Sequence, residues 1–263
     1  MENRIDRRFQ QVANDGRSVL VPYLTVGFPE LDMSFEIAKA ALRSGADILE
    51  LGIPFSDPLA DGPTIQMTSY KALQNNVNLK TALQFVVGLR KHDNTFPLIF
   101  MGYYNSFFKY GLSEFLTDAS NAGLDGLIIP DLPMEESEEV SKQCFEKGVY
   151  LIPLLAPTST DDRIELACRH AGGFIYCVSV TGVTGARKGL SGKVEDLVQR
   201  IKKFTTLPVL VGFGVSTRSD VDTIAEFADG AVVGSAFLNR IANSEPGEEM
   251  NEATNFLKEL TSH

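Results

Sequence analysis

The chain has 263 residues, of which 44% are hydrophobic, with a net charge of −10 and a pI of about 4.9. No stretch is rich in Lys or Arg, which argues against nucleic acid or an anionic membrane as partner, although backbone amides can bind a small phosphorylated ligand. The three cysteines lack CxxC spacing and no leader or membrane span is evident, so we expect reduced thiols and a cytoplasmic location.

Short apolar runs alternate with amphipathic helical patterns along the chain. A leading helix is expected at 4–14, and eight buried strands, each followed by a helix, are expected after it. This pattern predicts an α/β fold in one domain spanning 1–263, a (β/α)₈ TIM barrel with an extra N-terminal helix. A doubly wound open sheet is the alternative, disfavoured because no GxGxxG follows the first strand. The expected strands are 19–26, 47–51, 97–101, 126–129, 149–154, 174–178, 208–211 and 230–233, and the later helices are 34–44, 79–91, 113–121, 135–147, 161–170, 194–204, 218–227 and 248–261.

Helices that precede the even-numbered strands end in a recurring pattern. The segments 44–47, 122–125, 171–173 and 228–230 each carry glycine, and three of them also carry aspartate. Glycine there supplies the left-handed helix cap that a short connection to the next strand requires. This internal repetition supports the count of eight strands.

Glu50 interrupts the apolar strand 47–51, where an unpaired carboxylate would cost several kcal/mol. Two further acids, Asp57 and Asp61, follow on a loop rich in Pro and Gly. The three residues therefore predict a cluster of carboxylates at a strand end. The alternative, in which Glu50 forms a structural ion pair and the two aspartates cap turns, stays open.

In a barrel of this class, ligands bind at the carboxyl ends of the strands. Those positions are mostly apolar or aromatic here and suit a flat hydrophobic ligand, although any single aromatic could be ordinary core. Glycine-rich turns at 181–185, 212–214 and 234–236, with a short helix at 235–238, suit a phosphate held by backbone N–H groups. The loop 180–193 reads as a lid over that site, or alternatively as a disordered surface loop.

Other chemistries lack the residues that they need. His92, His170 and His263 lie on helices or at the tail, so no Ser or Cys nucleophile has a base. No metal-binding pattern occurs, and lysines avoid the strand ends. Acid–base chemistry by carboxylates is what remains.

The segment 49–66, LELGIPFSDPLADGPTIQ, resembles the signature of the tryptophan synthase alpha subunit family. The segments 22–27, 101–105, 130–133, 182–185, 212–215 and 234–236 agree with it, so the resemblance covers essentially the whole chain. It implies a lyase that cleaves indole-3-glycerol phosphate to indole and glyceraldehyde 3-phosphate, without metal or cofactor. It also implies an α₂β₂ complex with a beta subunit that carries pyridoxal phosphate, contacted through the loop 54–63 and the loops after the third and fourth strands.

The resemblance also implies a role for each matching residue. Glu50 would be the general acid and base, and Asp61 would accept the indole N–H and stabilise positive charge on the ring. Thr184 would tie the closed lid to Asp61. The substrate-binding residues would be Tyr23, Met101, Ile129, Tyr176, Thr184 and Phe213, and the phosphate-binding residues Gly185, Gly214, Gly234 and Ser235.

One residue departs from the family pattern, because Tyr23 stands where the family often has Phe. Two alternatives to the alpha subunit reading stay open. One is a free-standing enzyme that releases indole without a partner. The other is an inactive alpha-like subunit that only activates a beta subunit, which the intact Glu50, Asp61 and Thr184 disfavour.

Overall fold

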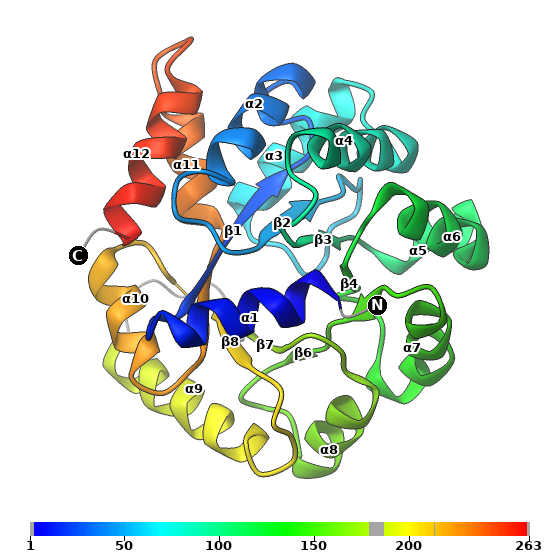
Figure 1. The fold of residues 1–263 in the computed structure, drawn as a ribbon, viewed down its shortest axis with the longest axis vertical. Helices are drawn as coiled ribbons and strands as arrows, with labels where there is room; N and C mark the ends of the chain where they lie inside the picture. The colour runs from blue at the N-terminus through cyan, green and yellow to red at the C-terminus, as the bar shows by residue number, and fades with distance from the viewer. Residues whose placement is uncertain (1–2, 179–186, 213, 262–263) are drawn as a thin grey trace.

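The computed structural model describes residues 3–178, 187–212 and 214–261, in which parallel strands form a barrel surrounded by helices (Figure 1). The sheet has the order β5-β4-β3-β2-β1-β9-β8-β7-β6, and every neighbouring pair is parallel. Its strands are β1 (Val19–Thr25), β2 (Leu49–Gly52), β3 (Leu98–Met101), β4 (Gly126–Ile128), β5 (Tyr150–Leu151), β6 (Leu154–Leu155), β7 (Ile175–Val178), β8 (Val209–Gly212) and β9 (Gly230–Val233).

The two strands at the ends of this order, β5 and β6, are halves of one strand position. They are separated only by Ile152 and Pro153, and proline has no N–H to donate to a neighbouring strand. Ile152 N–H still donates to Leu127 O at 2.9 Å on one side, and Tyr176 N–H donates to Pro153 O at 3.1 Å on the other. The nine strand segments therefore occupy eight barrel positions, which confirms the predicted (β/α)₈ barrel.

The expected helices are present. The structure adds two, Pro63–Gln74 and Tyr104–Tyr110, and extends the helices expected at 194–204 and 235–238. Helix α3 begins at Pro63 inside a segment that Pro and Gly mark as a loop, because proline is tolerated at the first helical position. The expected loop over 180–193 is wrong for 187–193, since α9 begins at Arg187; residues 179–186 lie outside the described part. The helices are α1 (Arg4–Asn14), α2 (Leu31–Ala41), α3 (Pro63–Gln74), α4 (Leu79–His92), α5 (Tyr104–Tyr110), α6 (Leu112–Ala122), α7 (Ser137–Glu146), α8 (Asp161–His170), α9 (Arg187–Ile201), α10 (Arg218–Ala225), α11 (Ser235–Ala242) and α12 (Glu249–Thr261), with a 3₁₀ turn η1 (Met134–Glu136).

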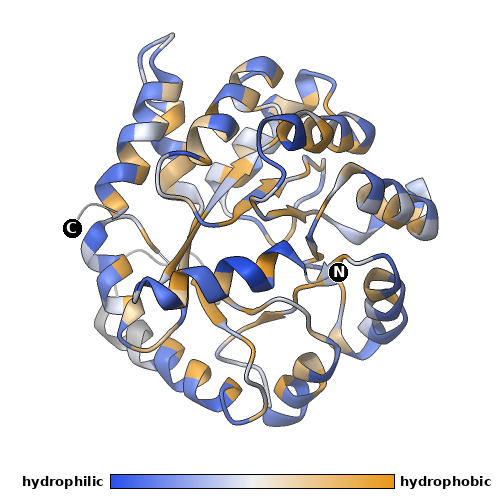
Figure 2. Cartoon of the chain, in the orientation of Figure 1, coloured by the Kyte–Doolittle hydropathy of each residue, from blue (hydrophilic) through white to orange (hydrophobic). Residues whose placement is uncertain are grey.

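Two apolar clusters form the core, one between the strands and the helices and one inside the barrel. Figure 2 shows hydrophobic residues on the strands and on the inner faces of the helices, and hydrophilic residues outside. Helix α1 crosses one end of the barrel (Figure 1), and its Ile5 packs into the interior cluster. Arg4 fixes this helix through a 2.9 Å ion pair with the buried Asp125, so one end of the barrel is closed.

Of the predicted glycine helix caps, only Gly123 is the left-handed C-cap of its helix, α6; α2, α8 and α10 have other residues at the C-cap. The recurring segments before β2, β4, β7 and β9 have a different structural role. In three of them, an aspartate bonds the first residues of the preceding barrel strand twice, through its N–H and through its carboxylate. The fourth copy, 171–173, lacks the aspartate. The bonds are Asp47 N to Leu20 O (2.8 Å) and Leu20 N to Asp47 Oδ2 (3.0 Å), Asp125 N to Leu98 O (2.9 Å) and Leu98 N to Asp125 Oδ2 (2.8 Å), and Asp229 N to Val209 O (2.9 Å) and Val209 N to Asp229 Oδ2 (2.8 Å).

No helix in the described ranges is both long and apolar enough to cross a membrane.

Candidate active site

Glu50, the second residue of β2, points into the barrel. Successive side chains of a strand alternate between its faces, so Glu50 shares the inward face with Ile48, which belongs to the interior cluster. Tyr23 of β1 and Ile99 of β3 are its neighbours in the sheet. The register thus places one carboxyl group on top of a dry apolar core.

The Glu50 carboxyl group is only 1% exposed, and neither of its oxygens has a hydrogen-bond partner among the described residues. Its pKa is raised to about 8, mainly by burial and to a smaller extent by the nearby charge of Asp61. Both effects disfavour the ionised form, because an apolar site and a second carboxylate each destabilise negative charge. Glu50 is therefore protonated at neutral pH, which excludes the structural ion pair considered from the sequence.

Asp61 lies on the loop between β2 and α3 and is the second carboxyl group of the site. Burial raises its pKa to about 6, while a hydrogen bond from the Tyr103 hydroxyl favours the ionised form and limits the increase. Tyr103 also accepts a hydrogen bond from Ala60 N–H at 2.9 Å and stacks on Phe55. It therefore holds the loop at two points. At pH 7 Asp61 is mostly ionised beside a protonated Glu50.

The third acid of the predicted cluster, Asp57, does not join the other two. Its side chain is exposed and accepts a 2.5 Å hydrogen bond from Ser56. The site thus holds two carboxyl groups, Glu50, which is buried, and Asp61, which is half-buried.

Aromatic and apolar side chains surround these two carboxyl groups. Tyr23 and Tyr176 both interact electrostatically with Glu50 and Asp61, and burial raises the pKa of each phenol. Met101 ends β3 half-buried, and Ile129 is buried directly after β4. These four predicted substrate-binding residues therefore lie on strands or strand ends around the site. Phe213 lies outside the described residues.

Glycines make room for the two tyrosines. A Cβ atom on Gly52, at the end of β2, would lie 1.9 Å from the Tyr23 hydroxyl oxygen. A Cβ on Gly212, at the end of β8, would lie 2.3 Å from Tyr176 Cε2. In both cases the glycine is the sheet partner of the residue two positions after the tyrosine. These packing roles, and the contact of Tyr103 with the Asp61 loop, depend on long-range contacts that no local sequence pattern indicates.

Two of the predicted phosphate-binding turns lie at the same end of the barrel. Gly214 follows β8 with a φ of 56°, a left-handed conformation that favours glycine. Gly234 precedes α11, which has no side-chain cap, and Ser235 is exposed at its first position. The N-terminal N–H groups of α11 are thus not occupied by a side-chain cap. Thr184 and Gly185 lie outside the described residues.

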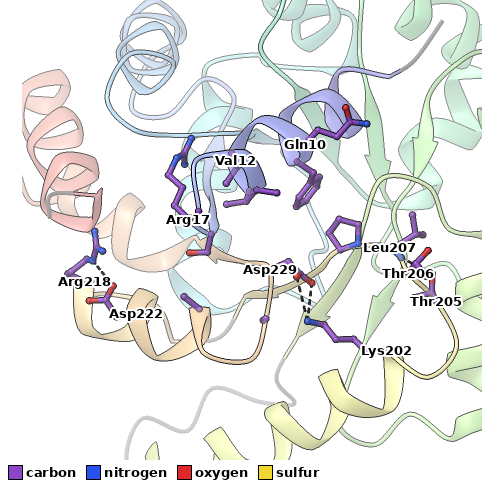
Figure 3. A pocket seen from close by; sticks show the side chains of 18 residues that line it. Gln10, Val12, Arg17, Lys202, Thr205, Thr206, Leu207, Arg218, Asp222 and Asp229 are labelled. Carbon is purple, nitrogen blue, oxygen red and sulfur yellow. Dashed lines mark hydrogen bonds and ion pairs between the residues drawn. The ribbon is translucent and has the colours of Figure 1, made fainter.

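A cavity of about 910 Å³ lies at the opposite end of the strands, between α1, α10 and the segment before β8 (Figure 3). Its lining cations form ion pairs, including Lys202 with Asp229 at 3.3 Å and Arg218 with Asp222 at 2.7 Å. In barrels of this class, that end contributes to stability rather than to chemistry. We therefore assign the site to the end that carries Glu50, where the perturbed carboxyl groups are.

A (β/α)₈ barrel with two coupled carboxyl groups in an apolar setting at the carboxyl ends of its strands defines a barrel enzyme of the acid–base type. Comparison with known proteins identifies the family within this class of enzymes. The family model described as "Tryptophan synthase alpha chain" matches residues 9–262. The chain belongs to the tryptophan synthase alpha chain family.

Individual relatives agree over nearly the full length. The chain is 46% identical to the tryptophan synthase alpha chain of Roseiflexus sp. (strain RS-1), over 98% of this chain and 99% of that one. It is 43% identical to that of Thermoanaerobacter pseudethanolicus, over 98% and 99%. The crystal structure of the tryptophan synthase alpha chain from Legionella pneumophila matches with a TM-score of 0.90 and 34% identity, covering 99% of this chain and 96% of that one.

We predict that the stability of the wild-type protein falls relative to Glu50→Gln as the pH rises from 5 to 9. The carboxyl binds its proton more tightly when folded, with a pKa of about 8 against 4.5, so its favourable contribution is lost as the pH rises through 8. The difference corresponds to at most about 5 kcal/mol in the free energy of unfolding. Urea denaturation of both proteins at pH 5 and pH 9 measures it.

The matched control is Glu138→Gln, on the exposed face of α7, which should follow the wild-type pH dependence. Parallel stability curves for wild type and Glu50→Gln would contradict the raised pKa.

Proposed function

We propose that this chain cleaves indole-3-glycerol phosphate to indole and glyceraldehyde 3-phosphate, as the alpha subunit of tryptophan synthase. The observation that carries the proposal is the pair formed by the buried carboxyl group of Glu50 and the half-buried one of Asp61, with pKa values of about 8 and about 6. At neutral pH this pair offers one proton donor and one fixed negative charge within an apolar site. Family membership supports the same reaction.

The reaction needs both carboxyl groups, in different protonation states. Indole leaves as a carbon leaving group only after C3 of its ring is protonated, and Glu50 donates that proton. The bond between C3 and the glycerol carbon then breaks, and its electron pair returns to the ring. The glycerol hydroxyl becomes the aldehyde of glyceraldehyde 3-phosphate, and its proton returns to Glu50. Glu50 thus acts first as an acid and then as a base.

Asp61 acts on the nitrogen side of the ring. Protonation at C3 places positive charge on the indole, and an ionised carboxylate that accepts the indole N–H stabilises this charge. The hydrogen bond from Tyr103 supports this role, because it favours the ionised form of Asp61. The reaction uses no metal or cofactor in this chain, and we expect pyridoxal phosphate only in the beta partner.

The remaining site residues bind the two ends of the substrate. Tyr23, Met101, Ile129 and Tyr176, with Thr184 and Phe213, contact the indole and glycerol portions. Gly185, Gly214, Gly234 and Ser235 bind the phosphate through backbone N–H groups. The uncapped N-terminus of α11 supports this assignment, because a helix N-terminus favours a bound anion.

A beta subunit would dock beside the Asp61 loop. Leu59, two residues from Asp61, is 96% exposed, and Phe108 on α5 is 67% exposed. Tyr103, which holds Asp61, immediately precedes α5. Exposed apolar side chains on both segments that fix Asp61 support a partner surface through which binding could adjust the site. We expect the complex to work in the cytoplasm.

Replacing either carboxyl group should stop the reaction without preventing ligand binding. For Glu50→Gln we predict a loss of indole release of about 10²–10⁴-fold, because the proton donor and acceptor is gone. For Asp61→Asn we predict a loss of about 10²–10³-fold, because the ring charge is no longer stabilised. The measurement is indole release by the purified chain, with the affinity for a non-cleavable indolylalkyl phosphate measured in parallel.

Asp57→Asn, at an exposed carboxylate of the same loop, is the matched control and should keep wild-type activity. Substantial turnover by Glu50→Gln would remove Glu50 from its assigned role. Wild-type activity of Asp61→Asn would refute charge stabilisation.

Leu59→Asp should weaken binding to a beta subunit by about 10–100-fold, because a fully exposed leucine contributes about 1.5–3 kcal/mol when buried. Its indole release without beta subunit should match that of the wild type. Titration with a purified beta subunit, followed by activation of indole release, measures the change. Phe145→Asp, at an exposed aromatic on α7, is the control. Fast wild-type turnover that a beta subunit does not alter would favour a free-standing enzyme instead.

A further inference from the structure

Asp61 is the half-buried carboxyl group of the site, and it lies immediately outside the start of α3. The hydrogen-bond ladder of this helix begins one residue later, where Gln66 N–H donates to the Gly62 carbonyl at 3.0 Å. A half-buried acid at a barrel rim reaches water by a small rotation of its backbone. What fixes the backbone of Asp61 therefore decides where its carboxyl group points.

Gly62, between Asp61 and the helix, is a flexible joint. Its φ of −75° and ψ of 169° are open to any residue, and a Cβ atom there would meet nothing within 4 Å. Neither the backbone conformation nor the available space thus requires a glycine. What glycine adds at this position is freedom of rotation, next to a residue of the site.

The side chain of Gln66 spans this joint. Its Nε2 atom donates to the Asp61 carbonyl oxygen at 2.8 Å, which extends the bonding of the helix backwards by one residue. On the other side of Asp61, Ala60 N–H donates to the Tyr103 hydroxyl at 2.9 Å. Asp61 is thus held from both directions along the chain.

Helix α3 gives Gln66 a fixed base. The Thr68 hydroxyl, on the buried face of the helix, lies 2.8 Å from the Thr25 hydroxyl at the end of β1 and donates to the Ile65 carbonyl at 3.0 Å. Both threonines are fully buried, so water does not compete for these bonds. A satisfied buried polar contact fixes the helix against the barrel strand. Gln66 therefore holds Asp61 relative to the barrel itself.

We propose that Gln66 is a positioning residue that holds the Asp61 backbone across the Gly62 joint and so keeps the Asp61 carboxyl group turned into the barrel. The Gln66 side chain is exposed, so its bond competes with water and its contribution is modest. The inference rests on the proposed function in one respect, since it takes Asp61 as the group that stabilises the ring charge.

The test is the titration of Asp61 in the protein without substrate. The side-chain carboxyl carbon of Asp61 is followed by NMR in protein labelled with ¹³C-aspartate, and Asp61→Asn assigns the signal. Gln66→Met keeps the length of the side chain and removes the donor, so Asp61 turns toward water more often. Its midpoint should then fall from about 6 by about one pH unit, toward the ordinary value of 3.8.

The sign of this change follows from the two effects on the pKa of Asp61. Burial raises the pKa, and the hydrogen bond from Tyr103 lowers it by a smaller amount, so exposure to water produces a net fall. The other ionisable groups that interact electrostatically with Asp61 are Glu50 on β2, Tyr23 on β1 and Tyr176 on β7. None of these groups is altered in the experiment.

Gly62→Ala should restore most of the midpoint in the Gln66→Met background. An alanine before Pro63 is restricted to the extended conformation that residue 62 already has, and this stiffening is similar in size to the loss of one exposed hydrogen bond. The matched control is Gln143→Met, which removes a 2.8 Å bond from Gln143 to Glu139 on the exposed face of α7. It should leave the Asp61 midpoint unchanged.

An unchanged Asp61 midpoint in Gln66→Met would overturn the proposal, and so would a fall that Gly62→Ala does not reduce or that Gln143→Met reproduces. Indole release by Gln66→Met should fall in parallel, by about 3–10-fold. The titration needs no turnover. A wild-type protein that releases no indole would refute the proposed lyase function, while the titration would still report on Gln66.

Discussion

The site depends on the burial of one carboxyl group that has no hydrogen-bond partner among the described residues. Glu50 faces an interior of aliphatic and aromatic side chains, so its ionised form is poorly solvated and it holds its proton at neutral pH. The negative charge of Asp61 strengthens this effect, and Tyr103 in turn keeps Asp61 ionised. Two chemically similar groups thus take opposite charge states because their surroundings differ.

The barrel separates the residues that stabilise it from those that react. At the end covered by α1, buried aspartates are satisfied by strand N–H groups and by arginines, as Asp125 is by Leu98 and Arg4. At the other end, no residue in the described part of the chain compensates Glu50 in this way. A fully satisfied network is stabilising, whereas an unpaired buried acid lowers stability.

Much of this arrangement follows from sequence periodicity. Eight apolar runs with intervening helices were enough to predict the barrel, and an acid inside an apolar run was enough to identify Glu50. The sequence did not indicate that Asp57 is exposed while Asp61 is half-buried, because that depends on Tyr103, which follows β3 and holds the loop. Helix α3 was missed because Pro63 and its flanking glycine mark both loops and helix starts. Long-range contacts, rather than local pattern, decide such cases.

The most direct test is the pH dependence of kcat/KM for indole release, which reports the essential groups of the free enzyme. Its alkaline limb is informative, since the phosphate of the substrate titrates only on the acid side. If a protonated Glu50 is required, activity falls as the pH rises through about 8, and this limb belongs to the coupled pair of carboxyl groups. Activity that stays constant from pH 7 to 10, or an alkaline limb whose fall is already complete at pH 6, would contradict a proton-bearing Glu50 at the centre of the site.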